Sequence, residues 1–338
     1  MKQEISEKIP VISFAMMCEV MLYHCESPDI SMAFNSTDLW WNQFLVNMVY
    51  GPFALLCMSW FFAITGFLLF HNLTFRNLGT KLKARVQTLF IPYVLWQVIY
   101  IVKSILQGNI WTINEMFSKI FLLRVWPPLG AFWYVYAVFL LSLLSPVFLL
   151  LFTNEKVGWL STVIMILLLY INWSNLNIND GHHYYTENIK AYFPAYLIGS
   201  FFGHIYDGSS IGQKLKYIVL FLLIGVLLDP AINRLLINIT IAVLPVFILF
   251  LFPVPDNFKN RKLYRLNFLI YATHQSIISL SINRIRAVML TVVPYISIVI
   301  ILGNVLCVLL IIAVNAGIHT FMNHFTPKTL KLLTGGRC

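Results

Sequence analysis

The chain has 338 residues, of which 59% are hydrophobic and only 11% are charged. A soluble domain carries roughly 25% charged residues, and a mean hydropathy of +0.79 leaves too much apolar surface for one water-soluble globule. The composition therefore excludes a soluble protein and predicts an all-α, polytopic integral membrane protein, with the lipid bilayer as its surroundings. The net charge of +10 is typical of basic cytoplasmic loops, so we expect no nucleic-acid partner.

Ten apolar stretches follow one another along the chain, most of them near the length of about 20 residues that a helix needs to cross a bilayer. The fifth to seventh are short, and the last is long enough to tilt. No small-residue cleavage site follows the first stretch, so we expect it to be retained rather than removed as a signal peptide. The expected helices lie near residues 9–25, 49–70, 86–106, 130–152, 157–173, 191–206, 216–230, 235–252, 266–282 and 289–316.

The distribution of Lys and Arg predicts that both termini are cytoplasmic. With ten spans and a cytoplasmic N-terminus, 16 of the 23 basic residues fall on the cytoplasmic side, as the positive-inside rule requires. We expect a single domain over residues 1–338, whose last 20 or so residues form a cytoplasmic tail. Two outer loops, residues 25–43 and 174–190, mix aromatics with amides and carboxylates. Their rings suit interface anchoring and also sugar stacking.

The cysteines and histidines do not indicate a metal site. The five cysteines are scattered, odd in number and without metal-ligand spacing. The adjacent His182 and His183 are weak evidence for a metal pair. We therefore expect neither a disulfide framework nor a metal cofactor.

The first apolar stretch, IPVISFAMMCEVMLYH, contains Glu19 and ends on His24. A carboxylate within a membrane span is costly, so Glu19 should face the bundle interior and have a partner. It lies about 140° around the helix from His24, so it does not share the face of the imidazole. Structural and functional interpretations of Glu19 remain open. Glu26, just past the helix, is better placed to contact the His24 ring.

Five further segments carry recognisable patterns in a definite order. They are WFFAITGFLLF (60–70), KLKARVQTLFIPYVLW (81–96), FWYVYAVFLLSLLSP (132–146), FPAYLIGSFFG (193–203) and LIYATHQSII (269–278). In order and spacing they resemble membrane acyltransferase family 3, the integral membrane O-acyltransferases that modify cell-surface glycans. The resemblance extends over nearly the whole chain and implies a fold of about ten helices.

The resemblance assigns a role to His24, which stands where the family has a histidine separated from a preceding arginine by ten residues. Ser13 occupies the position of that arginine, and Thr88 replaces the second arginine of the family's Arg-x-x-Arg, whose first is Arg85. Ser13 and His24 share a helix face and lie about 16 Å apart along the axis. His24 is expected to act as a general base or as an acyl carrier, with Glu26 and Glu19 as further catalytic candidates.

The donor site implied by the resemblance lies on the cytoplasmic side. Coenzyme A carries several phosphates, and cationic side chains bind phosphate strongly. The residues expected to bind the donor are Ser13, Lys81, Lys83 and Arg85. The three basic residues are also typical of an ordinary cytoplasmic loop under the positive-inside rule. The expected donor is acyl-CoA, with acetyl-CoA ahead of succinyl-CoA.

Two aromatic and two late-helix residues are the expected acceptor site. Trp133 and Tyr134 lie at the outer end of the fourth stretch, where a glycan or the interface would use them. His274 lies inside the ninth stretch, after Tyr271, and an intramembrane histidine is a candidate site residue. Its alternative role is an interhelical hydrogen bond, worth about 1 kcal/mol.

The sequence thus predicts a multi-pass enzyme of the bacterial cytoplasmic (inner) membrane. Its expected reaction moves an acyl group from cytoplasmic acyl-CoA to a hydroxyl of an extracytoplasmic glycan or polysaccharide in the cell envelope. A polysaccharide or lipid-linked sugar exporter, or a non-catalytic scaffold, is the alternative. The absence of paired half-repeats and of Gly/Pro-broken helices speaks against an exporter. A sensor of extracellular sugars would need a signalling partner.

Overall fold

The computed structural model describes residues 3–25, 48–121, 127–171, 184–208, 212–232, 239–259, 261–292 and 296–337. Within these ranges all regular secondary structure is helical, which confirms the all-α prediction. The chain divides into two compact units. The terminal unit comprises Glu7–Met58 and Val254–Cys338, and the central unit comprises Met1–Ser6 and Ser59–Pro253. The expected single functional domain over residues 1–338 stays a prediction.

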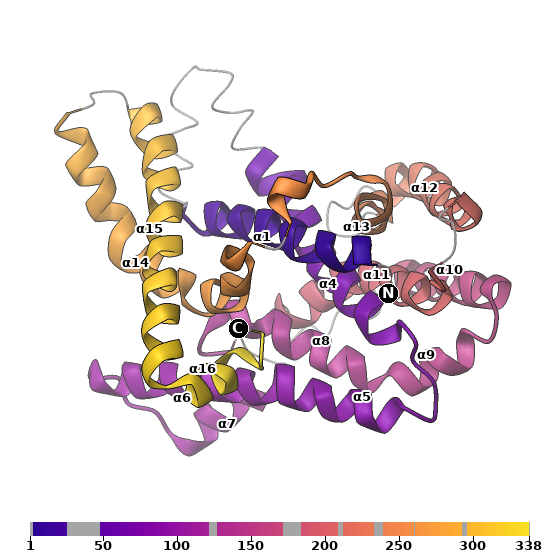
Figure 1. The fold of residues 1–338 in the computed structure, drawn as a ribbon, viewed down its shortest axis with the longest axis horizontal. Helices are drawn as coiled ribbons and strands as arrows, with labels where there is room; N and C mark the ends of the chain where they lie inside the picture. Colours follow the sequence, from indigo (N-terminus) through magenta and orange to yellow (C-terminus); the bar gives the residue numbers. More distant parts are fainter. Residues whose placement is uncertain are drawn as a thin grey trace. The chain divides into compact units, whose positions relative to one another are not determined.

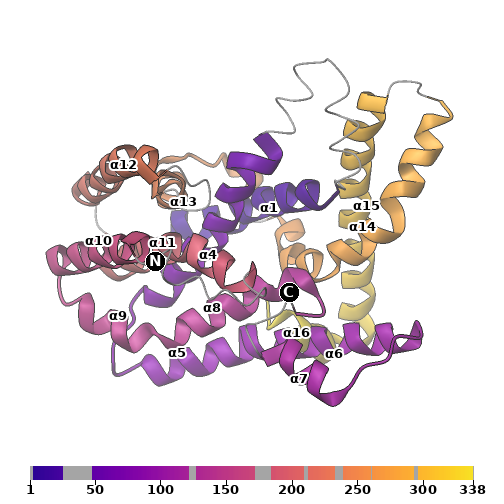
Figure 2. The same ribbon diagram turned by 180° about the vertical axis from the view of Figure 1, so that it is seen from behind.

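The terminal unit contains nearly all of α1 (Gln3–Cys25) and the last helices of the chain. The helices α14 (Asn267–Leu290) and α15 (Ile296–Phe325) lie side by side as a hairpin (Figures 1 and 2). Thr273 of α14 donates a hydrogen bond of 2.9 Å to the side-chain oxygen of Asn315 on α15. Such bonds hold helices together where apolar surroundings offer no water.

The expected cytoplasmic tail is itself helical. Residues 317–325 continue α15, and α16 (Pro327–Thr334) follows after Thr326. Gly335 ends α16 in the left-handed conformation, with φ of 62°, as glycine commonly does at a helix C-terminus.

The central unit is a succession of helices from the second to the eighth expected span. Two of its helices are interrupted. A π-helical turn, η2 (Val86–Phe90), separates α5 from α6. The helices α8 and α9 meet at an angle of 52°, and Pro146 is the second residue of α9. The expected absence of Gly/Pro-broken helices is therefore wrong at this break. The elements of the central unit are α4 (Ala54–Phe70, which begins in the terminal unit), α5 (Leu78–Arg85), η2, α6 (Ile91–Leu106), α7 (Ile113–Phe121), η3 (Gly130–Phe132), α8 (Trp133–Leu143), α9 (Ser145–Leu151), α10 (Glu155–Ile171), α11 (Tyr184–Ile205), α12 (Gly212–Ile232) and α13 (Ile239–Leu251).

Glycines bring α4 and α11 into backbone contact. A Cβ on Gly199 would lie 2.0 Å from the carbonyl oxygen of Ala63, and one on Gly203 would lie 2.3 Å from that of Phe67. The two glycines are four residues apart, so they form the small-xxx-small face that lets membrane helices approach closely. The segment FPAYLIGSFFG therefore owes its two glycines to helix packing.

Each of the ten expected spans contains helical residues, but their bounds differ: the span expected at 130–152 is divided between α8 and α9, and the one expected at 289–316 begins within α14. Length and apolarity support fewer spans than ten. Among the described residues, three helices are long and apolar enough to cross a membrane: Gly51–Phe70, Leu78–Leu106 and Ile298–Phe325. The bent pair Gly130–Leu143 and Ser145–Leu151 makes a fourth if it counts as one span. The chain is thus a membrane protein by its apolar helices. The number ten and the sides of the termini stay predictions.

The close contact of α4 with α11 makes Gly199→Ala destabilising. The added Cβ would meet backbone that cannot rotate away, and overpacking of this kind typically costs about 1–3 kcal/mol. We expect a lower unfolding temperature of the purified protein in detergent. Gly317→Ala on α15 is the matched control, because nothing lies within 4 Å of its Cβ position and alanine favours helix by up to about 1 kcal/mol. Equal unfolding temperatures for both variants would contradict the close contact.

Candidate functional site

The terminal unit brings two histidines from distant parts of the chain together. His24, one residue before the end of α1, is half-buried. Its ring centroid lies 5.1 Å from that of His274, in the middle of α14. Tyr23 meets the His24 ring edge-on at 5.2 Å. His24, the candidate catalytic residue, therefore lies next to His274, which is predicted to bind the acceptor substrate.

The His274 ring has a defined tautomer. Its side chain is fully buried, and Nδ1 lies 2.7 Å from the carbonyl oxygen of Tyr271. Because a carbonyl oxygen only accepts, Nδ1 carries the proton and Nε2 bears the lone pair. The Nε2 atom is buried and has no hydrogen-bond partner among the described residues. His274 thus presents a proton acceptor within the bundle, and Tyr271 acts on it through its backbone.

A cavity of about 260 Å³ opens beside this pair. Polar side chains of α14 line it at helical spacing, because residues three and four apart lie on the same helix face. These polar residues of α14 were not predicted from the sequence, although their spacing of three or four residues along the chain after His274 could have indicated them. The cavity is lined by His24, Cys25, Gln275, Ile278, Ser279, Ile282, Asn283 and Arg286.

Arg286 joins three helices at this cavity. It is 7% exposed and donates to the backbone carbonyl of Cys25 at 2.9 Å and to the side-chain oxygen of Asn304 on α15 at 2.7 Å. Cys25 is the last residue of α1, where carbonyls lack helical partners and carry partial negative charge. A buried cation there holds the end of α1, and with it the adjacent His24.

The other predicted residues of α1 have different surroundings. Ser13 lies on α1 and is half-buried, eleven residues before His24 as expected. One oxygen of Glu19 is buried without a hydrogen-bond partner among the described residues. The partner expected for Glu19 is therefore not found in the part of the chain that the structure describes. Glu26 lies outside the described residues.

The three basic residues of the predicted donor cluster have different surroundings in the central unit. Lys81 donates to the backbone carbonyls of Leu69, at 3.0 Å, and His71, so it caps the C-terminal end of α4. Lys83 is exposed on α5. Arg85 donates to the carbonyl of Thr65 at 3.2 Å. Lys83 and Arg85 remain the stronger candidates for a phosphate group.

Thr65 connects three of the recognisable segments. Its carbonyl accepts from Arg85, and its hydroxyl lies 2.8 Å from the hydroxyl of Tyr134. Because Tyr134 donates its one proton to the carbonyl of Phe61 at 2.9 Å, Thr65 is the donor in that contact. The Tyr134 hydroxyl thus links α8 to α4, and its expected contact with the acceptor stays a prediction.

The Trp133 ring also packs inside the central unit. Its centroid lies 5.9 Å from Phe62 and 6.0 Å from Tyr192. Phe62 and Tyr192 in turn stack on each other at 5.4 Å. The three rings pack against one another inside the unit, where Phe62 and Tyr192 are buried. An acceptor role for Trp133 stays a prediction.

The contact of Arg286 with Asn304 is testable by a double-mutant cycle with Arg286→Gln and Asn304→Ala. We expect each change to lower the free energy of unfolding in mixed micelles. The combined loss should be smaller than the sum, because both remove the same hydrogen bond; contacting residues typically couple by about 0.5–3 kcal/mol. Arg284→Gln, an exposed arginine on the same helix, is the control and should have little effect. Strictly additive losses would contradict the contact.

Comparison with known protein families identifies one family that matches this chain. The family described as the acyltransferase domain matches residues 14–313, a range that contains His24, Arg85 and His274. No curated protein and no solved structure matches the chain. Since the family match spans far more than half of the 338 residues, the chain belongs to membrane acyltransferase family 3.

Proposed function

We propose that the protein transfers an acyl group, acetyl or a short acid such as succinyl, from cytoplasmic acyl-CoA to a hydroxyl of an extracytoplasmic glycan. Its proposed location is the cytoplasmic membrane of a bacterium. Membership of an acyltransferase family supports the reaction class. The observation that carries the proposal is the contact of His24 with the buried His274, at a cavity lined in part by polar side chains of α14.

The proposed chemistry centres on His24, by one of two routes. As a general base, His24 takes the proton of the acceptor hydroxyl while that oxygen attacks the thioester carbonyl. The C–O ester bond forms, the C–S bond breaks, and the proton passes from His24 to the thiolate of coenzyme A. As an acyl carrier, the His24 nitrogen displaces the thiolate, which takes the ring proton. The acceptor hydroxyl then displaces the imidazole and returns a proton to it.

His274 is proposed as the partner of His24 rather than as a ligand of the acceptor alone. Its Nδ1 proton is committed to the Tyr271 carbonyl, so its ring orientation and tautomer are fixed. Its buried Nε2 offers a lone pair on the side of the ring that the backbone does not occupy. A neutral imidazole held in this way can orient His24 or accept a proton from it.

The donor is proposed to bind through Lys83 and Arg85. Arg85 is anchored by one bond to the Thr65 carbonyl, which leaves further guanidinium N–H groups for phosphate. The family's second arginine is Thr88 here, within the π-helical turn η2, and π-turns are frequent at functional sites. Ser13 can donate one hydrogen bond to the donor but adds no charge.

His24→Ala is expected to abolish acyl transfer, because it removes the proposed base or carrier. Loss of a general base typically costs about 10²–10⁴-fold in rate. The measurement is the O-acyl content of envelope glycans from expressing cells, released by mild base and analysed by mass spectrometry. His204→Gln, a histidine of α11 that packs on Phe152, is the matched control.

The same experiment separates the enzyme from its alternatives. Normal acylation by a folded, membrane-inserted His24→Ala protein would reject the proposal. If deletion of the protein stops glycan export while acyl groups stay unchanged, the exporter replaces the enzyme. Unfolding temperatures of both histidine variants show whether either change acts through stability.

Acyl-CoA binding is tested without knowledge of the acceptor. We expect acetyl-CoA, succinyl-CoA or free coenzyme A to raise the unfolding temperature of the purified protein. A ligand at 100 times its Kd adds about 2.7 kcal/mol to the stability of the folded state. Arg85→Ala should reduce the shift, measured against its own unliganded form. Arg76→Ala, an exposed arginine in the segment before α5, should not. A folded protein that responds to none of the three ligands would favour a scaffold or carrier.

A further inference from the structure

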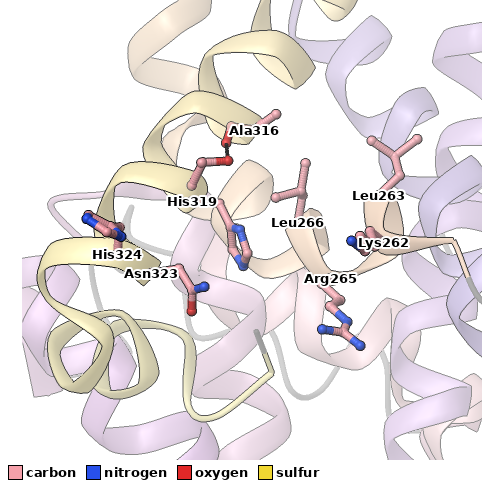
Figure 3. Close-up of a pocket in the computed structure, with 9 residues that line it drawn as sticks. Lys262, Leu263, Arg265, Leu266, Ala316, His319, Asn323 and His324 are labelled. Carbon is pink, nitrogen blue, oxygen red and sulfur yellow. Dashed lines mark hydrogen bonds between the residues drawn. The ribbon is translucent and has the colours of Figure 1, made fainter.

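A second hollow in the terminal unit lies away from His24, between η5 (Lys262–Leu266) and the last turns of α15. It is a surface groove of about 650 Å³, within the roughly 300–1,000 Å³ of small-molecule sites. In Figure 3 the Arg265 side chain comes from η5, and the His319 and Asn323 side chains come from α15. Its lining residues are Lys262, Leu263, Arg265, Leu266, Ala316, His319, Thr320, Asn323 and His324.

The lining is basic and carries no carboxylate. Lys262 and Arg265 contribute two positive charges, and the two histidines and Asn323 add groups that can donate hydrogen bonds. Leu263 and Leu266 supply an apolar part of the wall. A groove with cations on one wall, imidazoles on the other and apolar surface between them suits a phosphate attached to an organic group.

The nearby acidic residues are paired elsewhere. Asp256 accepts a hydrogen bond of 2.7 Å from Lys259, and this contact lowers the pKa of the Asp256 carboxyl. Glu7 lies 3.8 Å from the same lysine. Lys262 makes no ion pair with any residue that the structure describes. The positive charge of Lys262 is therefore not neutralised by an ion pair within the described residues.

We propose that this groove binds a phosphate-bearing ligand. Two sources carry that chemistry: a nucleotide, such as the adenosine 3′,5′-bisphosphate end of coenzyme A, and the head group of an anionic lipid. This proposal rests on the charge and shape of the groove and does not depend on the proposed acyl transfer. Only the nucleotide source, as part of coenzyme A, rests on that proposed function. Basic residues next to apolar helices attract either kind of phosphate.

The test uses the full-length protein in detergent or in phosphatidylcholine nanodiscs. The two probes are adenosine 3′,5′-bisphosphate, and phosphatidylglycerol added to the nanodiscs. We expect at least one probe to bind, and Lys262→Gln/Arg265→Gln to weaken that binding at least tenfold. The matched control is Lys328→Gln/Lys331→Gln, which removes two exposed charges from α16 outside the groove. It should change the binding less than threefold.

Each outcome decides the proposal. Binding of the nucleotide alone, of the lipid alone or of both supports the groove and identifies the source. No binding of either probe overturns it, and so does an equal loss in the groove and control variants, which would reflect net charge alone. If the double variant does not fold, Lys262→Gln replaces it, because this side chain is exposed. The thermal shift with acyl-CoA and the Arg85 variant reports separately on the proposed function.

Discussion

The candidate site depends on the contacts of Arg286. This residue of α14 joins the end of α1 to α15, which lies far away in the chain. Its guanidinium bonds to the last carbonyl of α1 and to Asn304 of α15, while its own backbone belongs to α14. In apolar surroundings an open helix end and a buried cation are each costly, and the bond between them offsets part of both costs. His24 is the residue before that carbonyl, so the same bond limits where its ring can lie.

The need to pair polar groups in apolar surroundings also explains contacts inside the central unit. Thr65 accepts from Arg85 and donates to Tyr134, so one α4 residue satisfies a cation and a phenol from two other helices. Glycines on α11 allow its backbone to meet α4 without side chains between them. Polar pairing and close backbone approach replace the hydrophobic driving force, which is weak between helices in lipid.

Basic residues in this chain have different surroundings even where they are close in sequence. Lys81 caps a helix, Arg85 is anchored to a neighbouring carbonyl and Lys83 is exposed. Lys259 pairs with carboxylates, whereas Lys262 lines an open groove. A count of charges on one side of the membrane captures topology but does not distinguish these surroundings.

The sequence by itself determined the helical membrane character and the family, because hydropathy, turn residues and short ordered patterns are local properties of the chain. It also singled out His24 and His274, each by its place in an apolar stretch. Only the tertiary structure decided that these two rings meet, that Arg286 holds the end of α1 and that the Tyr134 hydroxyl bonds to α4. Such contacts join segments far apart in sequence. Which faces of two helices meet depends on the packing of the whole unit, which no local pattern contains.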